Sequence, residues 1–68
     1  MKGSDLLDFV GKRVRVSSTV HTNIEDHPIY LYYTGTVLSV NDDTLRLRDK
    51  FEKLVVLTND SITHIAEE

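Results

Sequence analysis

Two histidines and two carboxylates lie in one short polar stretch of the chain, and such a group of side chains could bind a metal ion. His21 and His27 flank Glu25 and Asp26, and imidazole and carboxylate groups are ligands of divalent transition metals. Their spacing matches no structural zinc motif, however, and histidines and carboxylates in a surface loop are ordinarily solvated. The sequence therefore predicts neither a metal site nor a cofactor.

The sequence also lacks the residues and motifs that a catalytic site requires. The chain has no cysteine to act as a nucleophile, no glycine-rich phosphate-binding loop and no histidine–carboxylate pair at the spacing of a metalloprotease. Asp42 and Asp43 are adjacent carboxylates in a predicted turn, where neighbouring side chains point apart and are solvated. The sequence therefore predicts a protein that is not an enzyme.

Aromatic and basic side chains offer a different chemistry, which is the binding of nucleic acid. Tyr30, Tyr32 and Tyr33 crowd one predicted strand and could stack on bases, although tyrosine more often fills half-buried strand positions. Alternation puts Tyr32 on the opposite face from Leu31 and Tyr33, so Tyr32 is the best candidate for stacking. The basic residues concentrate on outward strand faces or in a turn and could attract phosphate if their strands are neighbours: Arg13, Arg15, Arg46, Arg48, Lys50 and Lys53.

The bulk composition limits the size and class of the protein. Its 68 residues fit one domain near the lower limit for a self-sufficient core, and chains of this size without disulfides often form oligomers. The net charge of −3 is mild evidence against strong nucleic-acid binding. Without cysteines, a signal peptide or a membrane-spanning apolar run, the sequence predicts a soluble, cytoplasmic protein with no membrane partner.

The pattern of apolar residues predicts the elements that position these groups. Ser4 can cap a short helix over about residues 4–10 that ends at Gly11, with an apolar face made of Leu6, Leu7, Phe9 and Val10. Alternation then predicts strands over about residues 12–20, 29–40, 44–49, 53–58 and 61–66.

Polar turns separate these strands, the longest of them over residues 22–28. Phe51 is expected to tuck under the turn over residues 49–52. Gly35 lies in the middle of the long second strand, where a glycine marks a sharp bend or a bulge. One helix followed by a five-stranded meander with a bent second strand is the pattern of a small closed barrel.

The fourth predicted strand is apolar on both faces, from Leu54 to Leu57. On the edge of a monomeric sheet such a strand would favour aggregation, so its character is explained if a neighbouring subunit covers it. The alternative is that a long hairpin folds over and buries both faces within one chain. The subunit interface is favoured over this alternative.

The order and spacing of these elements resemble the Sm-like family, which includes the bacterial Hfq proteins. Residues 6–16 resemble the family's N-terminal helix running into its first strand. Residues 35–41, with Gly35-Thr36-Val37 followed by Val40 and Asn41, resemble the first Sm motif. Residues 57–65 (LTNDSITHI) keep the spacing of the second Sm motif, in which two spaced apolar residues follow Ile-Arg-Gly.

The resemblance implies a mainly β fold, with a short N-terminal helix followed by a five-stranded, strongly bent, antiparallel SH3-like barrel of Sm type. It also implies a homo-oligomeric ring of about six or seven subunits, in which the fourth strand pairs with the neighbour's last strand. The implied interface residues are Leu54, Val55, Val56, Leu57, Ile62 and His64.

In this family, two loops that face the central pore bind RNA through hydrogen bonds, a stacking side chain and an Arg-Gly pair. Here Asn41 stands where the aspartate is expected, Asp43 stands near the stacking position, and Thr58-Asn59 replaces Arg-Gly. The replacement removes a guanidinium that would both stack and form hydrogen bonds. The resemblance therefore implies weak binding of single-stranded RNA at Asn41, Asp43, Thr58 and Asn59.

Two other functions stay open on the sequence alone. A ring or barrel that has lost the RNA pocket would act as a protein-interaction scaffold, and an unrelated SH3-like module would bind a peptide as a monomer. The oligomeric state separates the monomeric module from the other two, and RNA binding separates the Sm-like ring from the scaffold.

Overall fold

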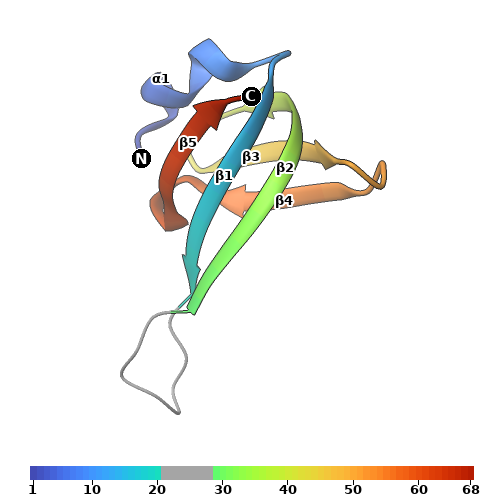
Figure 1. Ribbon diagram of the computed structural model, residues 1–68. Helices are drawn as coiled ribbons and strands as arrows, with labels where there is room; N and C mark the ends of the chain where they lie inside the picture. The colour runs from blue at the N-terminus through green and yellow to red at the C-terminus, as the bar shows by residue number, and fades with distance from the viewer. Residues whose placement is uncertain (21–28) are drawn as a thin grey trace.

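The computed structural model describes residues 1–20 and 29–68, so the polar stretch with His21, Glu25, Asp26 and His27 and the loop predicted over residues 22–28 lie outside the described residues. No helix in the described part is long and apolar enough to cross a membrane. The elements in this part are α1 (Gly3–Leu6), the 3-10 helix η1 (Leu7–Phe9), β1 (Arg13–Val20), β2 (Ile29–Val40), β3 (Thr44–Asp49), β4 (Leu54–Thr58), the 3-10 helix η2 (Asn59–Ser61) and β5 (Ile62–Glu67) (Figure 1).

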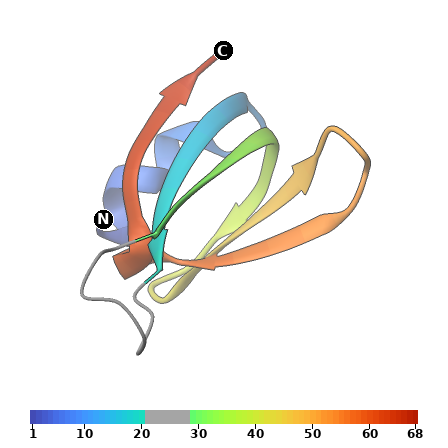
Figure 2. The same cartoon turned by 60° about the horizontal axis from the view of Figure 1, so that its bottom comes forward.

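The strands form one antiparallel sheet in the order β4-β3-β2-β1-β5. Strands β1 to β4 follow one another as the predicted meander, and β5 returns to pair with β1 (Figure 2). The predicted strands are confirmed to within one residue at each end. The mainly β fold with a short N-terminal helix is therefore confirmed, and the sheet is open, with β4 and β5 as its edges.

Alternation along the strands builds the core. In β1, Val14 and Val16 point inward while the arginines beside them face solvent, and β3 repeats this pattern with Leu45 and Leu47. Burial of each such side chain contributes about 1.5–3 kcal/mol. The buried apolar residues form one cluster, made of Leu6, Val14, Val16, Val37, Leu45, Leu47, Leu57 and Ile62.

Strand β2 curls over along its length (Figure 1), and its residue Gly35 is buried and pairs with Asp49 of β3. A side chain has no room at this position, because an ideal Cβ would overlap the carbonyl oxygen of Arg48 and lie 2.8 Å from the Cα of Asp49. The glycine is thus required by the close approach of β3. The bulge lies later in the strand, where the register shifts between Val37 and Ser39.

The N-terminal helix differs from its prediction. Ser4 lies inside the helix, and in the part of the chain that the structure describes no side chain caps the helix N-terminus. Only one turn is α-helical, and the chain continues as a 3-10 helix, in which side chains three residues apart lie on the same side. Leu6 is therefore buried and Phe9 is packed against the same core, whereas Leu7 and Val10 are exposed, contrary to the predicted apolar face.

The predicted position of Phe51 under the β3–β4 turn is wrong, because its side chain is 71% exposed. The turn is held instead by the carboxylate of Asp49, which accepts hydrogen bonds from the backbone N–H groups of Phe51 at 2.8 Å and Lys53 at 2.9 Å. These bonds close the turn and leave Phe51 outside it, with the Lys50 ammonium group 5.2 Å from the centre of its ring.

Candidate functional site

The two turns predicted to bind RNA lie against each other at one end of the sheet. The backbone N–H of Asn59 donates a hydrogen bond to the carbonyl oxygen of Asp43 at 2.8 Å. The side-chain amide of Asn59 donates to the carbonyl oxygen of Asn41 at 2.7 Å. We call this group of residues the turn cluster, and it comprises Asn41, Asp42, Asp43, Thr58, Asn59 and Asp60.

The side chain of Asn41 shapes its own turn. Its Oδ1 accepts hydrogen bonds from the backbone N–H of Asp43 at 2.9 Å, from the backbone N–H of Thr44 at 2.7 Å and from the Thr44 hydroxyl at 3.2 Å. This is the local bonding by which asparagine favours turns. Asn41 is exposed, but only its amide N–H groups are left for a ligand.

Asn59 is more deeply involved in the fold than the sequence suggests. It is only 2% exposed, and its buried Oδ1 has no hydrogen-bond partner among residues 1–20 and 29–68. Its amide therefore faces the protein and cannot reach a base edge. Of the four predicted RNA-binding residues, Asp43 and Thr58 are exposed, Asn41 is exposed with its oxygen occupied, and Asn59 is buried.

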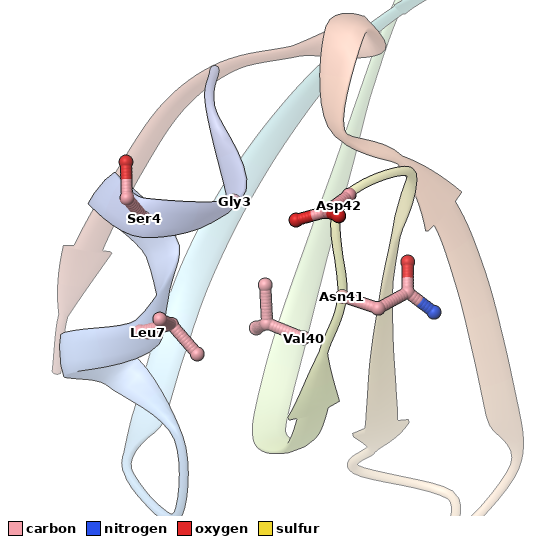
Figure 3. Close-up of a pocket in the computed structure, with 6 residues that line it drawn as sticks. All are labelled: Gly3, Ser4, Leu7, Val40, Asn41 and Asp42. Atoms are coloured by element: carbon pink, nitrogen blue, oxygen red, sulfur yellow. The ribbon is translucent and has the colours of Figure 1, made fainter.

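A shallow pocket of about 140 Å³ adjoins the turn cluster between α1 and the end of β2 (Figure 3). Leu7 and Val40 face each other across it, Asp42 turns toward α1, and the side chain of Asn41 turns away. Its volume is below the roughly 300–1,000 Å³ of typical ligand pockets. The pocket is thus too small to hold more than a fragment of a ligand.

The open edge of β4 carries unpaired backbone donors. Bonded and non-bonded residue pairs alternate along an antiparallel ladder, and the Asp49 N–H donates to the carbonyl oxygen of Lys53 at 3.0 Å. The alternation that starts from this pair directs the N–H of Val55 toward β3. It directs the N–H groups of Leu54 and Val56 away from the sheet, where a further strand could accept them.

The other edge, β5, shows the same alternation of inward and outward donors. The Glu68 N–H donates to the carbonyl oxygen of Arg13 at 2.9 Å, and the register continues from this pair to Ser17 opposite His64. The N–H of His64 therefore points toward β1, and the N–H of Ile65 points outward. Each edge presents outward donors in the middle of its strand.

The side chains predicted at the subunit interface divide into two groups. Leu54 is 60% exposed, Val56 is 53% exposed and His64 is also exposed. Val55 is half-buried against the core, and Leu57 and Ile62 belong to the core itself. Leu57 and Ile62 can therefore meet a neighbour only through their backbone groups.

No family model, curated protein or solved structure matches this chain. The candidate sites therefore rest on the geometry of the described residues. No cluster of three histidine, aspartate or glutamate side chains that could hold a metal lies within residues 1–20 and 29–68.

Replacing Asn59 with alanine is expected to destabilise the fold by about 1–3 kcal/mol, because the carbonyl oxygen of Asn41 loses its donor. Thr58→Ala is the matched control, since Thr58 is the exposed neighbour in the same turn, and its effect should stay within about 0.5 kcal/mol. Urea unfolding followed by circular dichroism measures both. Equal midpoints for the two variants would show that the Asn59–Asn41 bond does not hold the turns together.

Proposed function

We propose that the chain is an Sm-like protein whose copies join edge to edge into a ring of about six or seven subunits. We propose further that the ring binds single-stranded RNA weakly at the turn cluster. The observation that carries the proposal is the pair of open edges, β4 and β5, on opposite sides of one antiparallel sheet.

The two edges are suited to a head-to-tail assembly. β4 has five residues and β5 has six, so the strands match in length. When β4 of one copy pairs with β5 of the next, every copy uses both of its edges, and a closed ring leaves no edge free. The added strand would also cover part of the exposed apolar surface of Leu54 and Val56.

RNA binding at the turn cluster is expected to be weak for a physical reason. The exposed groups that could contact a base are the Asn41 amide and the Thr58 hydroxyl. Asp42, Asp43 and Asp60 are exposed carboxylates in the same cluster, and they repel phosphate. A ring repeats each weak contact in every subunit, so avidity can still hold a strand.

Native mass spectrometry with and without a uridine oligonucleotide tests both parts of the proposal. With a chain mass of 7.8 kDa, a ring of about five to eight subunits should appear at about 39–62 kDa. At low salt we expect this mass to increase by that of one oligonucleotide, and the complex should dissociate as salt is raised.

The other outcomes separate the alternatives. A ring that takes up no oligonucleotide at low salt would favour the protein-interaction scaffold. A clean 7.8 kDa monomer would overturn the ring and favour a peptide-binding module.

A further inference from the structure

The arginines and the carboxylates of the turn cluster occupy different places on the described surface. The turn cluster carries three exposed carboxylates, those of Asp42, Asp43 and Asp60. The arginines lie instead on the outward side of β1 and β3, where they alternate with buried core residues. A phosphate would be repelled at the turn cluster and attracted at the arginines.

The register of the sheet brings these arginines together. Arg13 and Arg48 both pair with Thr36, on opposite sides of β2, so one row crosses three strands. With strands about 4.8 Å apart, the backbones of the two arginines are about 10 Å apart. Arg15 lies opposite Thr34 in the next row of the same face.

An anion already lies between two of these arginines. The carboxylate of Glu68 is 2.9 Å from Nε of Arg13 and 3.8 Å from a terminal nitrogen of Arg15. The arginine side chains are still 63% and 68% exposed. No ion pair joins Arg46 or Arg48 to a carboxylate within the described residues.

A flat aromatic surface lies next to the arginines. Tyr32 pairs with Ser17 on the same outward face, one row beyond Arg15, and it is 70% exposed. Arg15 and Tyr32 are diagonal neighbours, within the reach of long side chains. Tyr33 packs against the core, so its role is structural. Tyr32 is not part of that packing, so core packing does not explain its position.

We propose that the outward face formed by Arg13, Arg15, Arg48 and Tyr32 binds single-stranded nucleic acid, with phosphates on the guanidinium groups and a base stacked on Tyr32. We call it the arginine face. It is separate from the turn cluster, and it rests on the proposed function only for the class of ligand. Glu68 competes with phosphate for Arg13 and Arg15.

Charge removal tests the phosphate contacts. Arg15→Gln with Arg48→Gln should weaken binding of a fluorescein-labelled uridine oligonucleotide at low salt. The plot of log affinity against log salt has a negative slope, and its steepness should decrease by about 1.4, because each lost phosphate contact on a single strand removes about 0.7. Lys2→Gln with Lys12→Gln removes the same charge outside the face and should leave the slope unchanged.

Substitution at Tyr32 tests the stacking. Tyr32→Ala should weaken binding about 5- to 150-fold at constant salt slope, because a stacked base is lost while the phosphate contacts stay. Tyr32→Phe keeps the ring and should bind like the wild type. Glu68→Gln should tighten binding, because it removes the competing carboxylate.

The outcomes separate this inference from the proposed function. If Asp43→Asn or Thr58→Val changes binding and the arginine pair does not, the turn cluster is the site and the arginine face is wrong. Equal salt slopes for the arginine and lysine double variants would also overturn the arginine face. If poly-glutamate competes as well as an unlabelled oligonucleotide does, the partner is an acidic protein and the arginine face is again wrong. The face contacts phosphate and base only, so RNA and DNA should bind within a few-fold of each other. A monomer that keeps the arginine-dependent slope would overturn the ring alone.

Discussion

Replacing Gly35 with alanine is expected to abolish the folded state. The new Cβ would overlap the carbonyl oxygen of Arg48, which belongs to the β3 backbone and cannot move without breaking the ladder between β2 and β3. A core of this size supplies about 3–5 kcal/mol, and a clash with backbone can cost more than about 4 kcal/mol. Circular dichroism and a thermal melt should show no cooperative unfolding transition.

Gly11→Ala is the matched control for this prediction. Gly11 has a φ of +82°, and beyond its chain neighbours no atom of the described residues lies within 4 Å of the added Cβ. The substitution therefore introduces backbone strain without a clash, and it should cost about 1–2 kcal/mol. If Gly35→Ala unfolds at the same temperature as Gly11→Ala, the close approach of β2 and β3 is not a constraint on the fold.

Val56→Pro is expected to convert the ring into monomers without unfolding the chain. The N–H of Val56 points away from β3, and proline is tolerated on an edge strand where the N–H faces outward. The missing donor and the proline ring would block the neighbour's β5. Light scattering should show the mass falling to the 7.8 kDa of one chain, with an unchanged far-ultraviolet spectrum.

Two further variants show whether the edge itself is responsible. Val55→Pro removes a donor that points toward β3, so it should unfold the chain instead of only dissociating the ring. Ile65→Pro removes the outward donor of β5 and leaves β4 open, whereas Val56→Pro leaves β5 open. When the two variants are mixed, the open β4 of one should pair with the open β5 of the other and form a dimer with one copy of each variant. A ring that persists in Val56→Pro would place the subunit contact elsewhere.

The strands were predictable because their signals are local. In β1 and β3 each apolar residue is followed by a polar one, and this period of two survives in the structure as inward valines and leucines and outward arginines. The turn at Asn41 is similarly local, since its side chain bonds to the backbone of Asp43 and Thr44. Such features need no knowledge of distant parts of the chain.

The features that were missed depend on distant parts of the chain. Asn59 is buried because α1 lies over the turn, where an ideal Cβ on Gly3 would be 3.4 Å from the Asn59 amide nitrogen. The need for glycine at position 35 comes from β3, and the exposure of Phe51 comes from the bonds that Asp49 makes to its own turn. The resemblance assigned both turns to one candidate site, but the use of their amides in the fold was not predicted.

The pairing of β5 with β1 also determines the order in which the sheet can form. The contacts from β1 to β4 join neighbouring strands, whereas the β1–β5 ladder must first bring together segments separated by the whole meander. Closing that loop lowers the chain entropy before the ladder can form, so pairing of β5 is expected to be the late, slow step of folding. Until then β1 is itself an open edge, and this intermediate is the species most exposed to pairing with the wrong strand.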